Sequence, residues 1–347
     1  MHWIVLLLLL MQQTTFADST TEDVSTPRHS EPPYERPIYA VIYGDTRWDG
    51  TTRDLKVLSK DPITALHRNV RDALLNLHLT SSFSLLIHLG DAVYSGDDLL
   101  QWSFFRDEFI NPLRRRGVAF RLVLGNHELE HYLFDLLPIG LDPLRTAATL
   151  GSIFADRPVE QSYTNQTIDF GFLTLVLVNS ALPREDIERY LEALQRSNPK
   201  PKILLLHRPL LATSLKHATI IESLRFESLL PLFPKLASWN IRTVLAGHDH
   251  VFSLLQVPSW PPQIVAPSAG VPLETPRTTE QLREDLQSER RALGLPKSVQ
   301  GIVYHGLAAY GYLLLKQESG KTLIIPYLSP DGKIFAPRED WSTEILR

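Results

Sequence analysis

Five short apolar segments of this 347-residue chain each end in residues that can bind a metal ion. An apolar run of about four to eight residues that stops at a turn residue is typical of a buried strand. One strand ending in Asp or His would be unremarkable, because such a buried residue usually forms a hydrogen bond in the core. Five such endings predict a single site, because ligands of open α/β sheets bind beyond the carboxyl ends of the strands. The segments are residues 38–45, 85–91, 121–128, 202–207 and 243–250.

The ends of these segments form an ordered set of short motifs. The order resembles that of the calcineurin-like metallophosphoesterase superfamily over roughly residues 37–270. One motif alone is weakly specific, whereas five in this order are highly specific. The resemblance implies an α/β fold of two packed mixed β-sheets flanked by helices, a four-layer sandwich, and a metal-dependent phosphoric ester hydrolase. The motifs are Asp45-Thr46-Arg47, Gly90-Asp91, Gly125-Asn126-His127-Glu128, His207 and Gly247-His248-Asp249-His250.

The resemblance also implies two metal ions and a set of ligands for each. Asp91 would bridge the ions, because each oxygen of one carboxylate can face one cation. Carboxylate, amide oxygen and imidazole ligands suit Fe, Mn or Zn. Two such ions hold the phosphate group and lower the pKa of a bound water, so that metal-bound hydroxide attacks phosphorus directly. The other implied ligands are Asp45, Tyr94 and His250 for the first ion, and Asn126, His207 and His248 for the second.

Arg47 departs from the common motif. Many members of the superfamily have a metal-binding His at this position, and a guanidinium has no lone pair for a cation. The spacing of residues 90–94, Gly-Asp-Ala-Val-Tyr, resembles that of purple acid phosphatases, in which a tyrosinate binds ferric iron. Tyr94 would then be a ligand and the first ion ferric; the alternative is an aromatic ring that packs over the site. Arg47 would bind the substrate phosphate through its planar donors, or form a surface salt bridge.

The resemblance assigns His127 to the substrate and not to a metal. Together with Asn126 and Arg47 it would contact the phosphate, and it would protonate the leaving group. The alternative is a purely structural histidine. Glu128 and Asp249 are expected to orient neighbouring imidazoles, which metal-bound histidines usually require.

The N-terminal residues predict export. Residues 3–11 are apolar and residues 15–17 include small residues, so residues 1–17 are typical of a secretory signal peptide. The apolar stretch is short for a permanent span, although an uncleaved signal-anchor is the alternative because no Lys or Arg precedes it. Residues 18–36 are polar and contain prolines, as in a flexible linker. The absence of cysteine excludes disulfides and fits a periplasmic or secreted bacterial protein.

Residues 37–347 are predicted to form one metallophosphoesterase domain, because the site residues span 45–250. Within it, residues 274–296 are charged and predict a helical surface insertion, with a partner-binding helix as the alternative. Residues 301–334 alternate like antiparallel strands and are predicted to close the second sheet. Substrate choice is expected to depend on the loops at 47–60, 129–161 and 208–222.

These observations predict an exported phosphoesterase that hydrolyses small-molecule phosphate monoesters. A phosphodiesterase is the nearest alternative, because the same metals serve both reactions. A catalytically inactive binding protein with this fold is a further alternative. The only reason for it is Arg47, which stands where many members have a metal-binding His. The formal net charge of −4 argues against a nucleic-acid partner, and no stable membrane span is expected after signal cleavage.

Overall fold

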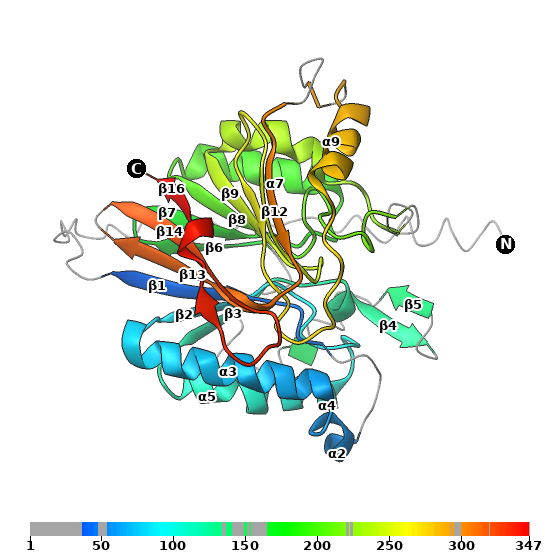
Figure 1. The fold of residues 1–347 in the computed structure, drawn as a ribbon, viewed down its shortest axis with the longest axis vertical. Helices are drawn as coiled ribbons and strands as arrows, with labels where there is room; N and C mark the ends of the chain where they lie inside the picture. Colours follow the sequence, from blue (N-terminus) through cyan, green and yellow to red (C-terminus); the bar gives the residue numbers. More distant parts are fainter. Residues whose placement is uncertain are drawn as a thin grey trace, which may run out of the picture. The chain divides into compact units, whose positions relative to one another are not determined.

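Two mixed β-sheets lie face to face, and helices cover the outer face of each (Figure 1). Within the part of the chain that is described, no helix is long and apolar enough to cross a membrane. The predicted signal peptide and linker lie outside that part. The structure is a computed structural model and describes residues 37–47, 54–133, 137–140, 149–150, 153, 165–219, 222, 225–291, 293–294, 300–318 and 320–346.

The first sheet places three of the predicted ligand segments side by side. β1 pairs in parallel with β2, and β2 pairs in parallel with β3, so the three strands end at the same edge of the sheet. On its other side β1 pairs antiparallel with β13, and β13 pairs with β14. The strand order is β15-β14-β13-β1-β2-β3, with β16 also on β14. The bounds are β1 Ile38–Tyr43, β2 Leu85–His88, β3 Ala119–Leu122, β13 Tyr310–Glu318, β14 Lys321–Ser329, β15 Ala336–Pro337 and β16 Thr343–Leu346.

The second sheet carries the other two ligand segments. β7, β8, β9 and β11 are parallel neighbours, and β6, β10 and β12 pair antiparallel. The order is β12-β10-β11-β9-β8-β7-β6, so β8 and β9 end next to each other. The bounds are β6 Gln166–Phe170, β7 Leu173–Leu177, β8 Lys202–Leu205, β9 Ile241–Ala246, β10 Phe252–Gln256, β11 Gln263–Val265 and β12 Val303–Leu307.

The central strands are apolar on both faces because both faces are covered. Ile42 and Ile87 of the first sheet share one buried cluster with Leu175, Ile203 and Leu245 of the second. Strands enclosed in this way are typically continuous apolar runs. That is the pattern by which the sequence predicts them.

Helices supply the two outer layers. α3 begins after Asp61, whose carboxylate accepts a hydrogen bond from the Ile63 N–H at 2.7 Å, and Pro62 occupies its first turn. α3, α4 and α5 cover the first sheet, and α7 and α9 cover the second (Figure 1). The bounds are α2 Leu55–Leu58, α3 Pro62–Ser81, α4 Leu99–Phe105, α5 Asn111–Arg114, α7 Arg184–Ser197 and α9 Thr279–Ser288; π-helical Arg106–Ile110 joins α4 to α5, and 3₁₀ turns span His127–Leu129, Leu230–Trp239 and Glu339–Trp341.

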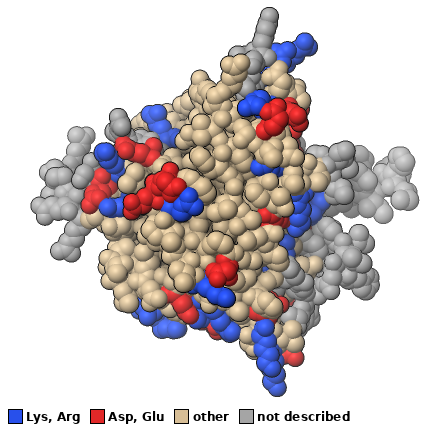
Figure 2. All heavy atoms as spheres, in the orientation of Figure 1, with Lys and Arg blue, Asp and Glu red and all other residues tan. Residues whose placement is uncertain are grey.

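Two C-terminal segments, the last hairpin and the predicted helical insertion, can be compared with their predictions. The β13–β14 hairpin was expected to close the second sheet, but it pairs with β1 and therefore belongs to the first sheet; only β12 joins the second. α9 lies within the predicted insertion, and its Leu282 and Leu286 are fully buried against the second sheet. A separate hairpin, β4 (Glu130–Leu133) with β5 (Leu137–Gly140), follows the third ligand segment. On the face in Figure 2, basic and acidic side chains are interspersed.

Candidate metal centre

The loops that follow β1, β2, β3, β8 and β9 converge at one place. The Asp45 N–H donates to the Gly90 carbonyl at 3.0 Å, which joins the first two loops. The Gly247 N–H donates to the His207 carbonyl at 2.9 Å, which joins the last two. The His248 N–H lies 3.1 Å from both carboxylate oxygens of Asp45 and so joins the two sheets. All of the predicted ligands and His127 are buried.

The backbone is strained where ligands leave the strands. Asp45, Asp91 and His248 have φ values of 56°, 57° and 70°, a region of backbone conformation that residues other than Gly rarely adopt. Such conformations persist only where the surrounding structure enforces them, and they gather at functional sites.

At Gly125 a Cβ atom would come within 2.3 Å of Asp91 Oδ1, so the motif requires glycine there.

Asp91, Asn126, His207 and His248 form the second predicted ligand set. His207 Nδ1 lies 2.8 Å from the Leu89 carbonyl oxygen, which can only accept, so Nδ1 carries the proton and Nε2 is bare. His248 Nε2 lies 2.8 Å from Glu222 Oε1, so His248 Nδ1 is bare by the same argument. His207 Nε2 lies 3.1 Å from His248 Nδ1, 3.1 Å from Asn126 Oδ1 and 3.3 Å from Asp91 Oδ1. Lone pairs that converge without a proton between them fit a cation.

Asp45, Asp91 and His250, three of the four ligands predicted for the first ion, lie together; Tyr94 is the fourth. One ligand atom of each of these three lies within 4.8 Å of the others. His250 Nδ1 lies 3.1 Å from Glu274 Oε1, and Nε2 lies 3.8 Å from Asp45 Oδ1. Asp91 is the member that both ligand sets share, as a bridging carboxylate would be.

The protonation states also fit metal binding. Burial lowers the pKa of His207, His248 and His250, the last to about 4, so all three imidazoles are neutral near pH 7. Neutral imidazole is the form that binds a metal. Burial, and then the charge of Asp91, raise the pKa of Asp45 well above its usual range. A cation between these carboxylates would relieve their repulsion.

Arg47, Tyr94 and His127 lie together on one side of Asp91. Arg47 Nε is 3.5 Å from Asp91 Oδ2, and its guanidinium lies 5.9 Å from the centre of the Tyr94 ring. Tyr94 and His127 have ring centroids 5.3 Å apart. His127 Nδ1 is 2.9 Å from the Tyr94 carbonyl oxygen, so it carries the proton, while Nε2 is 3.9 Å from Asp91 Oδ2. Burial lowers the pKa of His127 to about 3, although Asp91 opposes this shift.

Glu128 and Asp249, which were expected to orient imidazoles, accept hydrogen bonds from the neighbouring loops. Glu128 accepts hydrogen bonds from the backbone N–H groups of Gly125, Asp91 and Ala92 at 2.7, 2.8 and 2.6 Å. Asp249 accepts from the Ser214 N–H at 3.0 Å and from the Thr213 N–H and hydroxyl. Both carboxylates thus hold loops in place through these bonds.

Glu222, Glu274 and His217 contact the predicted ligands, and no sequence motif marks them. Glu222 contacts His248, and Glu274 contacts His250. His217 lies between these two carboxylates, with Nε2 3.2 Å from Glu274 Oε1 and Nδ1 3.7 Å from Glu222 Oε2. Burial alone would lower the pKa of His217, but Glu222 and Glu274 raise it to about 10. His217 and Glu222 lie in the loop at 208–222, the one sequence signal that pointed to them; Glu274 belongs to no motif.

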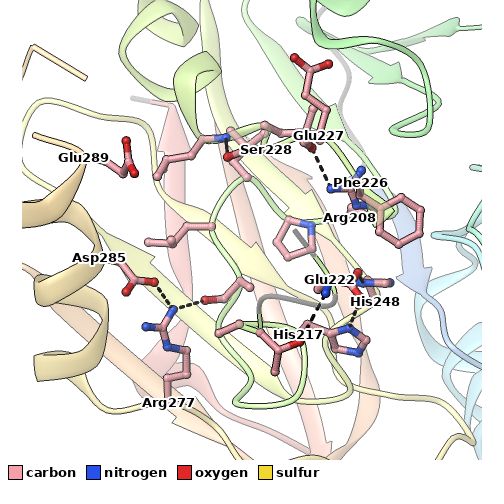
Figure 3. Close-up of a pocket in the computed structure, with 18 of the residues that line it drawn as sticks. Arg208, His217, Glu222, Phe226, Glu227, Ser228, His248, Arg277, Asp285 and Glu289 are labelled. Carbon is pink, nitrogen blue, oxygen red and sulfur yellow. Dashed lines mark hydrogen bonds and ion pairs between the residues drawn. The ribbon is translucent and has the colours of Figure 1, made fainter. Parts of the chain in front are cut away.

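A cavity of about 640 Å³ adjoins the metal centre (Figure 3). His217, Glu222 and His248 line it, and the ion pair between Arg277 and Asp285 (2.7 Å) lines it near α9. Its volume is in the range of small-molecule sites. Apolar side chains contribute much of the remaining lining, among them Leu210, Leu211, Phe226, Leu229 and Leu230.

Comparison with known proteins agrees with this geometry. The family model described as calcineurin-like phosphoesterase matches residues 49–252. No curated protein sequence is similar enough to count as a match.

Solved structures share the fold. The purple acid phosphatase PPD1 of yellow lupin (Lupinus luteus) aligns with a TM-score of 0.58 and 17% identity, over 90% of this chain and 54% of the lupin chain. This chain thus spans about half the length of that protein. GAP50, the anchor in the inner membrane complex of Plasmodium, aligns at 0.54 and 11%, over 90% and 89% of the two chains. A dimetal phosphatase from Danio rerio aligns at 0.51 and 10%, over 89% and 98%. The predicted fold class is confirmed.

Proposed function

This chain belongs to the calcineurin-like phosphoesterase family, as its motifs predicted, and we propose that it hydrolyses small phosphate monoesters with a two-metal centre. The observation that carries the proposal is the position of Asp91. It is the carboxylate common to the set with Asp45 and His250 and the set with His207 and His248. Asn126 completes the second set through its side-chain oxygen.

Two cations held there would neutralise charge on the phosphate and lower the pKa of a water molecule. The chain itself would orient the substrate. Arg47 is held beside Asp91 and offers planar N–H donors that match phosphate oxygens. Asn126 and His127 follow β3, and the His127 N–H donates to Asp91 Oδ1, so both residues lie beside the carboxylate that the metals would share. We expect both to contact the same phosphate.

His127 is the proposed proton donor to the leaving group. Its Nδ1 proton is committed to the Tyr94 carbonyl, so Nε2 is the atom that gains and loses a proton. Burial keeps this atom unprotonated in the free protein. A phosphate dianion beside the ring would favour the imidazolium and so raise this pKa.

Monoesters are proposed ahead of diesters because Tyr94 has the spacing found in purple acid phosphatases. The cavity beside His248 offers room for the organic part of a substrate. A similar structure is described as an anchor in Plasmodium, so the fold by itself does not imply turnover.

Residues 1–17 support export to the periplasm or the medium.

The test is hydrolysis of an aryl phosphate monoester and of its diester analogue by the purified protein with Fe, Mn or Zn. We expect metal-dependent turnover, a higher rate on the monoester, and loss of both activities in Asp91→Asn. A higher rate on the diester would establish the alternative reaction. If the wild type is as inactive as Asp91→Asn with every metal, the binding-protein alternative stands.

A further inference from the structure

Arg47 occupies one side of the carboxylate that the two metal sites share. Its Nε atom lies 3.5 Å from Asp91 Oδ2, while Asp91 Oδ1 faces His207 Nε2 at 3.3 Å. The two oxygens therefore have different neighbours: Oδ1 lies near the bare His207 nitrogen and accepts a hydrogen bond from the His127 N–H at 3.1 Å, and Oδ2 lies near a permanent positive charge. The Arg47 side chain is only 11% exposed, so solvent screens that charge weakly.

Arg47 is fixed close to Asp91 by the backbone as well. The N–H groups of Thr46 and Arg47 donate to the Asp91 carbonyl oxygen at 3.0 and 2.9 Å. The arginine thus follows Asp45 by two residues and is tied to Asp91, and both of these residues belong to the first ligand set. A cation bound by that set would lie near the guanidinium.

We propose that the two sites bind divalent cations with unequal affinity, and that the Arg47 guanidinium weakens the site of Asp45, Asp91 and His250. The site of His207, His248 and Asn126, with Asp91 Oδ1, then binds its cation first. This inference rests on the proposed two-metal centre. It adds an order of binding and names the residue that sets it.

The Arg47 guanidinium lies close to two members of the first ligand set. Its Nε atom is 3.5 Å from Asp91 Oδ2, and Arg47 follows Asp45 by two residues. A fixed positive charge at this distance repels a cation bound by the same carboxylates. The histidines of the second set are already oriented for a cation. The Leu89 carbonyl and Glu222 fix His207 and His248 with their bare nitrogens 3.1 Å apart.

The proposal can be tested by titrating Zn²⁺ into the chelator-treated full-length chain and following the heat of binding. We expect two events in the wild type whose dissociation constants differ by at least about tenfold, a common scale for groups that touch metal ligands. His207→Ala should remove the tight event, and His250→Ala should remove the weak one. Arg47→Gln, which removes the charge, should strengthen the weak event by about tenfold or more and change the tight one little.

Two variants separate the charge of Arg47 from other effects. Arg47→Lys keeps the charge and should keep the weak event weak. Arg115→Gln makes the same change in net charge at an exposed position at the end of α5, and should leave both events unchanged.

Several results would overturn the inference. They are two equal sites in the wild type, loss of the tight event in His250→Ala, or an unchanged weak event in Arg47→Gln. A folded wild-type protein that takes up no Zn²⁺, Mn²⁺ or Fe would instead overturn the proposed function and this inference with it. Two equal sites together with metal-dependent hydrolysis would overturn this inference alone.

Discussion

The Glu128 carboxylate accepts a hydrogen bond from the backbone N–H of Asp91 at 2.8 Å. The acid of the Gly-Asn-His-Glu motif therefore fixes the loop that carries the shared ligand. Its two oxygens also accept from Gly125 and Ala92, so one buried side chain joins the loops after β2 and β3. This carboxylate, together with the hydrogen bond from the His127 N–H to Asp91 Oδ1 at 3.1 Å, sets the spacing between Asp91 and Asn126.

Replacing Glu128 by Ala should therefore weaken the fold and the metal centre together. Three buried backbone N–H groups would lose their acceptor, and a buried donor left without a partner costs about 1–3 kcal/mol. We expect the free energy of unfolding to fall by about 3 kcal/mol or more in urea titrations, with a lower Zn²⁺ affinity. Glu284→Ala, at an exposed position on α9, should change neither quantity. Wild-type stability and Zn²⁺ affinity in Glu128→Ala would contradict this role.

Glu274→Gln should weaken metal binding with little change in stability. The Glu274 carboxylate lies 3.1 Å from His250 Nδ1 and 3.2 Å from His217 Nε2, so its negative charge holds the His250 ring in place. Loss of such a partner typically lowers metal affinity by about 10–100-fold. Competition with a chelator for Zn²⁺ measures the effect. Glu289→Gln, exposed at the end of α9, is the matched control, and equal affinities in the two variants would exclude the role of Glu274.

The sequence predicted the ligands because each lies directly after an apolar strand, where the local pattern is informative. Asp45, Asp91 and His207 meet because the ends of neighbouring parallel strands meet. Glu274 could not be predicted in this way. It lies in a segment without regular structure, and its backbone N–H donates to the His250 carbonyl at 3.1 Å, a contact that no local pattern indicates.

The C-terminal strands illustrate the same limit at the level of the fold. Alternation predicts strands around residues 312–327, but it contains no information on which sheet they join. β13 pairs with β1 through residues Ile38 to Ile42, a long-range contact that depends on how the whole chain packs. The periodicity therefore predicted the element and not its partner.

Visible absorption of the iron-loaded protein tests whether Tyr94 is a metal ligand. A tyrosinate bound to ferric iron absorbs visible light by charge transfer, and Tyr94 lies beside Arg47 and His127 at the centre. We expect a visible band when the protein is loaded with ferric iron and its complete loss in Tyr94→Phe. Tyr312→Phe, a buried tyrosine of β13, should keep the band. A band that persists in Tyr94→Phe would leave Tyr94 as a packing residue.

His67 should make the fold less stable in mild acid. It is buried on α3, and its ring stacks on Phe109 with centroids 3.5 Å apart. Burial, with further contributions from His88 and Arg71, lowers its pKa well below the usual 6.5. Between pH 6.5 and the folded-state pKa, the unfolded chain binds a proton at this residue and the folded chain does not. Stability that His67 supports near neutral pH is therefore lost as the pH falls below about 6.5.

The measurement is the free energy of unfolding of metal-free protein at pH 7.5 and pH 5.5, in the wild type and in His67→Leu. The unfolded-state titration alone predicts that His67 accounts for about 1.4 kcal/mol of the decrease between these values. His67→Leu should show a decrease that is smaller by this amount, whatever other groups titrate in the same range. Val70→Ala, a buried change one turn along α3, should lower stability equally at both pH values. If His67→Leu and the wild type lose the same stability, His67 takes up its proton equally in the folded and unfolded chains, and burial does not keep it neutral.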